Sequence, residues 1–298
     1  MSTVTADPST LPLGNRLLRV FRRGFELALA GAIGAVFGLY FYVELVHTEN
    51  LETRDLLAGA LIGGSIGFFL NASDGYREGA WRKMSRTASW GAVVGAIGGA
   101  LGLWIGEKIL TGFQGGLLGR AISWAVLGLG IGVSQGLAYR SVPRLKFGLV
   151  GGGIGGFFGG FLFEAIRTRM GTRYDLGQAF GIVILGGGLG LCLALIESVL
   201  GRVWVQVMNG RQEGRSYLLT GSKSTLGLDE RADVGLFGDP AIARLHAEII
   251  DNRGDASLIV RDGKERTKLN GLVVTSAAPL HDGDRIELGG TLLVFRKR

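Results

Sequence analysis

The amino-acid sequence predicts a two-domain fold: an all-α bundle that crosses a membrane six times, followed by an all-β sandwich. Two observations predict the bundle. Six charge-free apolar stretches of 17 to 21 residues follow one another, and 40 of the 53 glycines lie in residues 24–202. A third observation predicts the sandwich, because apolar residues recur with a period of two after Arg202, between turns marked by Gly, Asn, Asp and Pro.

Composition excludes several other classes. With 5 prolines and no Gly-X-Y period the chain is not a collagen, and its 47 % hydrophobic content is too high for a disordered glycine-rich linker. The single cysteine, Cys192, excludes a disulfide framework and a cysteine-based zinc site. The three histidines, His47, His246 and His281, lack metal-ligand spacing. We therefore expect no metal site, no cofactor and no catalytic centre.

Each apolar stretch is long enough to cross the ~30 Å hydrocarbon core as a helix. The expected spans are residues 27–43, 56–73, 87–106, 121–139, 147–163 and 176–196. The expected domains are a cytoplasmic N-terminal tail (1–23), a glycine-rich transmembrane domain (24–202) and the sandwich (203–298).

The distribution of Lys and Arg predicts the orientation in the membrane. Eleven of these residues lie before the first span and in the loops that follow the second and fourth spans. Six lie in the loops that follow the first, third and fifth spans. The more positive side is cytoplasmic by the positive-inside rule, so both termini are expected in the cytoplasm of a bacterial cell. This placement of the positive charge in the loops also argues against a nucleic-acid partner.

Glycine motifs divide the transmembrane domain into three tandem helical hairpins. The first helices of the hairpins carry related motifs that begin at Gly31, Gly95 and Gly152, and the second helices carry motifs that begin at Gly63, Gly128 and Gly186. Glycine lets helix backbones approach closely in lipid, where the hydrophobic effect does not drive helix association. Parallel repeats of this kind predict pseudo-threefold symmetry about the membrane normal.

A glutamate follows the first motif of each hairpin: Glu44, Glu107 and Glu164. One interpretation is a ring of carboxylates at the entrance of a cation channel. The other is that these charges mark the ends of the membrane segments. No ionisable residue lies within the six stretches, and this favours the second interpretation.

The C-terminal segment carries a series of motifs in a defined order. These are Gly227, Asp239-Pro-Ala-Ile-Ala-Arg244-Leu-His246, Thr267-Lys-Leu-Asn270-Gly271 and Pro279-Leu-His-Asp282-Gly283-Asp284-Arg-Ile-Glu-Leu-Gly289. The segment resembles the forkhead-associated (FHA) domain family over about residues 205–298. The resemblance implies an eleven-stranded sandwich that binds phosphothreonine peptides through loops at one end, without catalysis.

The resemblance also implies roles for individual residues. Asn270, followed by Gly271, matches the residue that holds the peptide backbone, Thr267 matches a phosphate contact, and His246 matches the side chain that braces the loop. Two phosphate ligands of the family are replaced, because Leu228 stands where an arginine follows Gly227, and Ala243 stands where a serine precedes Arg244. Substitute positive charges could come from Arg231, Arg244 and Arg266.

The function expected from these features is a membrane-anchored scaffold that recruits a cytoplasmic protein partner. Dependence on phosphothreonine is left open by the two replaced ligands. The other possibilities are phosphate-independent peptide binding or self-association, and a domain with a purely structural role. The alternative function is a small channel or transporter that is regulated or assembled by the FHA-like domain. The sequence gives no support to an enzyme.

Overall fold

The computed structural model describes most of the chain and divides it into two compact units, Leu11–Leu200 and Gly201–Arg298. The described residues are 13–112, 116–139, 142–170, 174–200, 203–219, 222–230, 232–252, 255–263 and 266–297.

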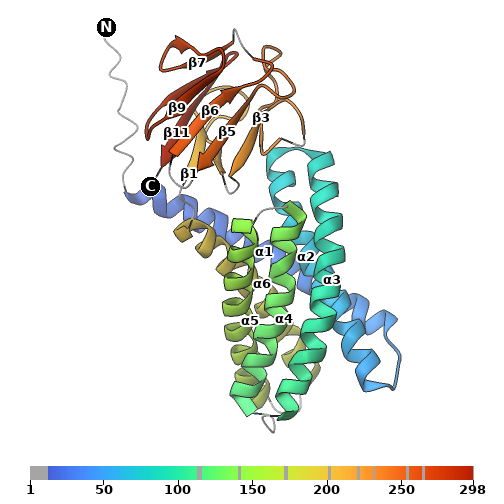
Figure 1. Ribbon diagram of the computed structural model, residues 1–298. Coiled ribbons are helices and arrows are strands. Elements are labelled where there is room, and N and C mark those ends of the chain that lie inside the picture. The colour runs from blue at the N-terminus through green and yellow to red at the C-terminus, as the bar shows by residue number, and fades with distance from the viewer. Residues whose placement is uncertain are drawn as a thin grey trace. The chain divides into compact units, whose positions relative to one another are not determined.

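Long helices make up most of the described residues of the first unit (Figure 1). In the described residues they are α1 (Leu13–Leu45), α2 (Leu51–Glu78), α3 (Trp81–Gly112), α4 (Gly116–Tyr139), α5 (Val142–Met170) and α6 (Tyr174–Leu200). All six of these helices are long and apolar enough to cross a membrane, so the predicted helical membrane bundle is confirmed. The helix α1 begins ten residues before the end of the expected tail, since residues 13–23 are helical.

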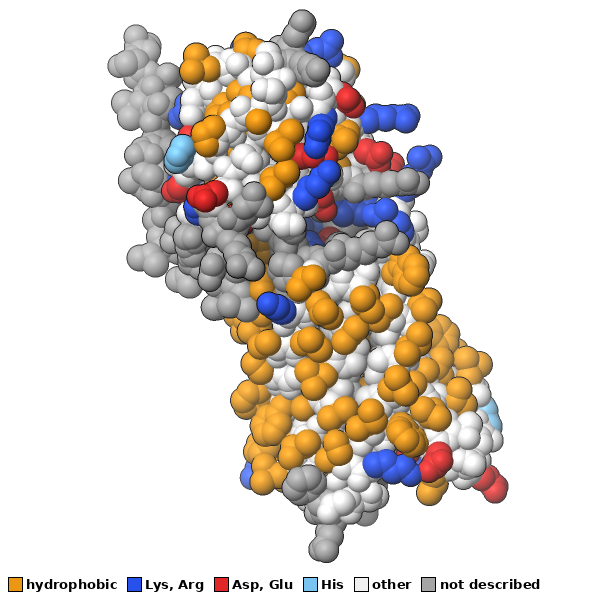
Figure 2. Space-filling model, viewed as in Figure 1, with side chains coloured by type: hydrophobic (Ala, Val, Ile, Leu, Met, Phe, Trp, Pro, Cys, Tyr) orange, Lys and Arg blue, Asp and Glu red, His pale blue; other side chains and the backbone are white. Residues whose placement is uncertain are grey.

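The surface of the helical unit matches a lipid environment. Figure 2 shows hydrophobic side chains over the visible face of this unit, with charged side chains gathered near its ends. Exposed side chains along α1 include Phe25, Phe37 and Tyr40, which are between 46 % and 60 % exposed. In water an apolar surface of this size would promote aggregation, whereas in a bilayer these side chains contact lipid.

Consecutive helices pack against each other, and α6 packs against α1, so the helices form a closed ring. The neighbours meet where glycine removes a side chain. A Cβ atom at Gly34 of α1 would lie 2.7 Å from the Cα of Ile66 in α2, and one at Gly155 of α5 would lie 2.8 Å from the Cα of Leu189 in α6. These distances are too short for any side chain, so each glycine sets the separation of two helices.

The helix α5 presents glycines on two faces. Gly152 lies against Gly128 of α4, whereas Gly155 lies against Leu189 of α6. The helix is therefore in close contact with a neighbour on each side.

The second unit is a sandwich of two sheets, as predicted. In the described residues its strands are β1 (Val203–Val207), β2 (Ser216–Leu218), β3 (Lys223–Gly227), β4 (Val234–Gly235), β5 (Ala247–Asn252), β6 (Asp255–Val260), β7 (Thr267–Leu269), β8 (Leu272–Val273), β9 (Ala277–Leu280), β10 (Arg285–Leu288) and β11 (Thr291–Lys297). One sheet has the order β2-β1-β11-β10-β7-β8 and the other the order β4-β3-β5-β6-β9.

Alternating side chains of the two sheets form the core between them. Val203, Val205 and Val207 of β1 point inward, and Phe295 of β11 is opposite Val205 in the register of the sheet. All four are at most 2 % exposed. This inward-facing alternation is the reason for the period of two in the sequence.

Candidate peptide-binding loops and buried charge clusters

A buried histidine joins the segment before β5 to the segment that leads into β7. His246, which directly precedes β5, is fully buried, and its Nδ1 accepts a hydrogen bond of 3.0 Å from the backbone N–H of Ala243. Nδ1 therefore carries no proton, and Nε2–H donates to the hydroxyl of Thr267 at 3.1 Å. That hydroxyl in turn donates to the carbonyl of Gly263 at 2.8 Å. We call this chain of hydrogen bonds the histidine brace.

The brace requires a neutral imidazole. Burial lowers the pKa of His246, and the nearby Arg266 guanidinium acts in the same direction. The neutral form leaves Nδ1 free to accept and Nε2 free to donate, as the observed contacts require.

The segment after β3 runs beside the segment before β5. The backbone N–H groups of Leu228 and Asp229 donate to the carbonyls of Ala243 and Arg244 at 3.0 and 3.1 Å. A Cβ at Gly227 would collide with the carbonyl of Arg244, so only glycine fits there. The structure thus brings together Gly227, Leu228, Ala243 and Arg244.

Leu228 turns toward the protein interior. Its side chain is partly buried and packs against the apolar core of the sandwich. Ala243, on the facing segment, has no polar side-chain atom. The two positions where the family places phosphate ligands therefore offer none.

Thr267 is fully buried within the brace. Its single hydroxyl proton goes to Gly263 and its oxygen accepts from His246. As placed, this hydroxyl is not available to a peptide, so the expected phosphate contact at Thr267 does not fit the structure.

Asn270 and Gly271 form the tip of the hairpin between β7 and β8. Both have positive φ angles, 51° and 83°, which is the type I′ geometry of a two-residue hairpin. The Asn270 amide donates to Asp284 at 2.8 Å and accepts from the backbone N–H of Arg285 at 2.9 Å. This tip is three residues, or about 10 Å, along the strand from Thr267. The structure therefore does not bring Asn270 to the brace, and its local role is to hold this turn.

Two of the three arginines proposed as substitutes are exposed near the brace. Arg244 is exposed in the segment before β5, and Arg266 is exposed and donates to the carbonyl of Ala241 at 3.3 Å. Arg231 lies outside the described residues.

Asp239 fixes the loop that carries Ala243 and Arg244. Its carboxylate accepts from the backbone N–H groups of Ala241 and Gly290 at 2.9 and 2.7 Å. The hydrogen bond from Ala241, together with the one from Gly290, lowers the pKa of Asp239. The loop is thereby tied to the turn between β10 and β11.

The three glutamates of the helical unit do not behave alike. Arg120 of α4 pairs with Glu107 of α3 at 2.8 Å and with Glu164 of α5 at 3.7 Å. Glu44 is exposed at the end of α1, and no contact joins it to this cluster within the described residues. The structure thus groups two of the carboxylates around an arginine instead of forming a ring of three.

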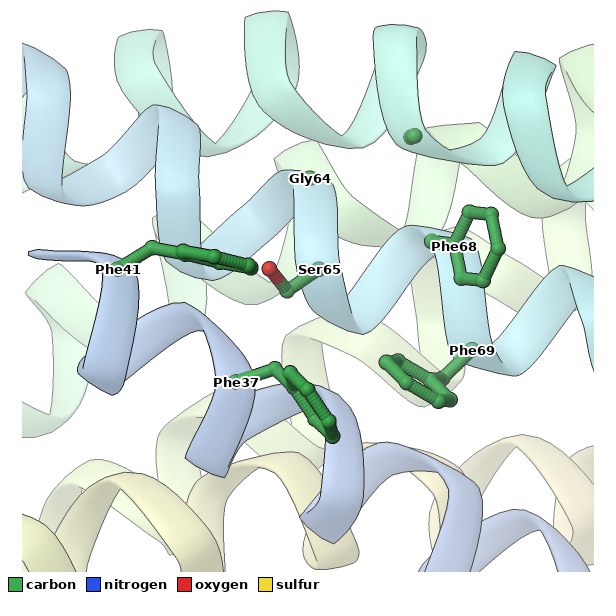
Figure 3. A pocket seen from close by; sticks show the side chains of 7 residues that line it. Phe37, Phe41, Gly64, Ser65, Phe68 and Phe69 are labelled. Carbon is green, nitrogen blue, oxygen red and sulfur yellow. The ribbon is translucent and has the colours of Figure 1, made fainter.

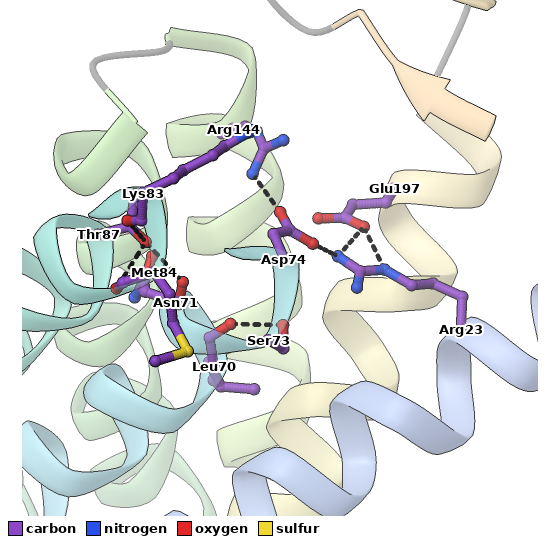
Figure 4. Close-up of polar contacts among 10 residues, drawn as sticks. All are labelled: Arg23, Leu70, Asn71, Ser73, Asp74, Lys83, Met84, Thr87, Arg144 and Glu197. Atoms are coloured by element: carbon purple, nitrogen blue, oxygen red, sulfur yellow. Dashed lines mark hydrogen bonds and ion pairs between the residues drawn. The ribbon is translucent and has the colours of Figure 1, made fainter. Parts of the chain in front are cut away.

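A second charge cluster lies at the other end of the helices and was not predicted (Figure 4). Asp74 of α2, with its side chain 8 % exposed, accepts from Arg23 of α1 at 2.8 Å and from Arg144 of α5 at 2.9 Å. Arg23 also contacts Glu197 of α6 at 3.3 Å. Sequence reasoning missed it because each residue stands just outside an apolar stretch, where a charge is ordinary.

The buried polar contacts continue from Asp74 toward the middle of the helices. The Asn71 amide donates to Gly67 at 2.7 Å and to the hydroxyl of Ser134 at 3.2 Å. The Thr87 hydroxyl donates to the carbonyl of Asn71 at 2.9 Å. The contact with Thr87 joins α2 to α3 (Figure 4), and the contact with Ser134 joins α2 to α4.

The helical unit also has an apolar groove, of about 290 Å³. It is lined mainly by Phe37 and Phe41 of α1 and by Phe68 and Phe69 of α2, which surround Ser65 (Figure 3). The rings of Phe37 and Phe69 stack with centroids 5.2 Å apart. Apart from the hydroxyl of Ser65 the side chains of this lining are apolar, which suits hydrocarbon.

No group of His, Cys, Asp and Glu side chains in the described residues could hold a metal ion. Cys192 is a half-buried free cysteine of α6.

The second unit matches one family model. Residues 206–298, under a third of the chain, match the family model described as the inner membrane component of T3SS, cytoplasmic domain. No curated protein matches the chain.

Three solved structures of FHA domains are similar to this part of the chain. One, from a structural and functional analysis of phosphothreonine-dependent FHA domain interactions, is 29 % identical and matches over 33 % of this chain and 97 % of that chain, with a TM-score of 0.30. The FhaA FHA domain, complexed with the intracellular domain of Rv3910, is 30 % identical over 32 % and 99 %, with a TM-score of 0.29. The FHA domain of the CT664 protein from Chlamydia trachomatis is 25 % identical over 33 % and 98 %, with a TM-score of 0.30.

Residues 206–298 match the family model, and the same part of the chain forms the two-sheet sandwich that the FHA-like motifs predict. The C-terminal third of this membrane protein is therefore an FHA-like domain.

Proposed function

We propose that the protein is a membrane-anchored scaffold whose FHA-like domain binds a segment of a cytoplasmic protein without requiring phosphate. The observation that carries this proposal is the position of Leu228. Where the family has a phosphate-pairing arginine, this chain has an apolar side chain that packs into the core. Anchoring by the helices raises the effective concentration of the domain at the membrane, so weak binding suffices.

The free energy lost with the two phosphate ligands favours binding that does not depend on phosphate. A charge-assisted hydrogen bond contributes about 1.5–3 kcal/mol, so loss of an arginine and a serine ligand removes on the order of 100-fold in affinity. The burial of Thr267 removes a third expected contact. Groups that a peptide could still meet include the exposed Arg244 and Arg266 and the backbone of the segments beside them.

Arg244 and Arg266 support the competing possibility of phosphothreonine-dependent binding, because both are exposed near the brace. A titration of the full chain in lipid nanodiscs separates the two. One arm uses a degenerate phosphothreonine peptide library, and the other uses its unphosphorylated twin. Equal binding to both libraries supports the proposal. Binding to the phosphorylated library alone contradicts it and assigns the phosphate to another arginine.

The proposed topology has both termini in the cytoplasm of a bacterial cell, with the helices in its cytoplasmic membrane. It is supported by the excess of Lys and Arg in the loops of one side. A Cys192→Ser chain with Leu272→Cys provides a test, since Leu272 is 75 % exposed in the FHA-like domain. An impermeant maleimide should label it only after the cells are opened. Labelling in intact cells would reverse the topology.

A scaffold is favoured over the alternative of a cation channel by the pairing of Glu107 and Glu164. Both carboxylates pair with Arg120, and the Glu164 side chain is only 7 % exposed, whereas a ring at a cation entrance would need carboxylates that are accessible to the ion. A liposome flux assay addresses the alternative. Saturable, ion-selective flux that is abolished by replacing Glu44, Glu107 and Glu164 together would establish a channel.

A further inference from the structure

We propose that the groove of α1 and α2 binds one acyl chain of an anionic phospholipid, and that the phosphate of this lipid lies between Arg22 and Arg77. The groove and the two arginines belong to the same pair of helices, the groove in the hydrocarbon region and the arginines beyond its edge. We call the strip of helix surface between them the lipid path. This site belongs to the helical unit alone, so its occupancy is independent of what the FHA-like domain binds.

The groove has the size and the lining for a hydrocarbon chain. Its small residues are Gly64, which has no side chain, and Ser65, and phenylalanines of α1 and α2 surround them (Figure 3). A water molecule takes about 30 Å³ of the liquid and a methylene group is similar in size, so a groove of about 290 Å³ accommodates on the order of ten methylenes. A helix with its side chains is about 10–12 Å in diameter, which is too thick to lie within this volume. The groove therefore fits an acyl chain better than a partner helix.

The groove lies at the depth where acyl chains end. Ser65 stands in the middle of the apolar stretch 56–73. Arg77 follows Phe69 by eight residues, which is about 12 Å along a helix. Half of the hydrocarbon core is about 15 Å, which is the reach of the acyl chains of one leaflet. A lipid with its phosphate at Arg77 therefore has a chain long enough to reach Phe69.

Side chains at helical spacing continue the groove toward the arginines. Positions three and four residues apart lie on one face of a helix. On α1 this face carries Arg22, Glu26, Leu29, Ile33, Phe37 and Phe41, and on α2 it carries Ser65, Phe69, Ala72 and Tyr76. The two faces meet at both ends of the lipid path, because Phe37 stacks on Phe69 with centroids 5.2 Å apart and Glu26 pairs with Arg77 at 3.9 Å. Leu29, Ile33 and Tyr76 are all exposed, so the path is open to lipid along its length.

The charges at the end of the lipid path favour an anionic headgroup. Glu26 pairs with Arg22 at 3.1 Å and with Arg77 at 3.9 Å, so one carboxylate faces two guanidinium groups. The two arginine side chains are 79 % and 37 % exposed. The excess positive charge attracts the phosphate of an anionic lipid, and a guanidinium can bind two phosphate oxygens at once. The same two helices thus supply a hydrocarbon groove and the groups that bind a phosphate.

Lipid titration followed by native mass spectrometry tests the site. The full chain is purified in detergent and titrated with phosphatidylglycerol or with phosphatidylcholine of the same acyl chains, and bound lipids are counted per chain. The first phosphatidylglycerol should bind about tenfold more tightly than the first phosphatidylcholine. Arg22→Gln with Arg77→Gln should remove this preference, whereas Arg54→Gln, which replaces an exposed arginine at the other end of α2, should keep it. Ser65→Leu fills the groove and should weaken the binding of both lipids by about tenfold or more, because the acyl chain loses its contacts there.

A matched pair of variants separates the groove from the rest of the lipid-facing surface. Phe37→Ala removes a wall of the groove and should weaken binding of the first lipid. Phe180→Ala removes a similarly exposed ring of α6 outside the groove and should not. Circular dichroism verifies that each variant keeps its helices.

Several outcomes would overturn the proposal. They are equal affinity of the unchanged chain for the two lipids, full lipid binding by Ser65→Leu, equal losses in Phe37→Ala and Phe180→Ala, and loss of the headgroup preference in Arg54→Gln. A dimer without bound lipid that Ser65→Leu converts to a monomer would overturn it as well, because the groove would then hold a second copy of the chain.

Discussion

The imidazole Nε2 of His246 and the hydroxyl of Thr267 are 3.1 Å apart, and neither side chain is exposed to solvent. This contact joins the segment before β5 to the start of β7. Thr267, which the resemblance implies would contact the phosphate of a bound peptide, therefore lies in the interior of the domain. The loops of the FHA-like domain are therefore held by a hydrogen-bond chain that a ligand does not reach.

The histidine brace predicts a pH dependence of stability. Burial lowers the folded-state pKa of His246, so below about pH 6.5 the unfolded state binds more protons than the folded state. Stability of the FHA-like domain should be full above this pH and fall as the pH drops toward the folded-state pKa. The measurements are an NMR titration of the His246 ring and thermal unfolding between pH 5 and 7. A His246→Gln chain should lose this slope, and a ring that titrates above 6.5 would contradict the assignment.

Thr267→Val should destabilise the FHA-like domain. It leaves the His246 Nε2–H and the Gly263 carbonyl without the hydroxyl that both now contact. A buried polar group without a partner costs about 1–3 kcal/mol. Thr267→Ser keeps the hydroxyl and should be close to the parent chain in chemical denaturation. If the two variants unfold at the same denaturant concentration, the hydroxyl does not stabilise the brace.

The two replaced ligands predict a gain of phosphate recognition. Leu228→Arg with Ala243→Ser should raise affinity for phosphothreonine peptides by on the order of 100-fold, since each restored charge-assisted contact contributes about 1.5–3 kcal/mol. Affinity for the unphosphorylated twin should change little. Because Leu228 packs partly on the core, Leu228→Met is the control for packing, and circular dichroism verifies folding. No gain in a folded double variant would place the phosphate-binding geometry outside these loops.

Glycines of α5 should differ sharply in their tolerance of alanine. At Gly155 a new Cβ would lie 2.8 Å from the Cα of Leu189, so α5 and α6 must separate at a cost of about 1–3 kcal/mol. At Gly153 it would lie 3.2 Å from the end of the Leu129 side chain, which is exposed and can move. Thermal unfolding in detergent should therefore show a lower midpoint for Gly155→Ala and not for Gly153→Ala. Gly155→Leu should separate the helices altogether, and equal midpoints for the two alanine variants would contradict the packing argument.

The membrane helices could be predicted because their signal is local. A charge-free apolar stretch of 17 residues or more needs no knowledge of its neighbours to be recognised as a span. The ends of the helices were less predictable, as α1 shows by beginning at Leu13. Beyond the hydrocarbon region, a helix continues as long as its backbone and side chains allow, and hydropathy does not report this.

The FHA-like domain could be predicted from its alternation and motifs, but the roles of its residues could not all be predicted. The Asn270-Gly271 pair matches a motif, yet positive φ angles at both residues make it a hairpin tip distant from Thr267. The motif fixes the residue types, whereas the pairing of β7 with β8 makes Asn270 and Gly271 a two-residue turn.

The sequence by itself determined the two domains, the apolar spans, the glycine contacts available to each helix and the loss of two phosphate ligands at Leu228 and Ala243. Only the tertiary structure decided that Thr267 is buried, that Arg120 gathers two glutamates, and that Asp74 is shared by Arg23 and Arg144. The physical reason is range. Hydrophobicity and backbone propensity act between near neighbours in the chain, whereas a buried charge or hydroxyl takes its role from partners that are brought to it from distant segments.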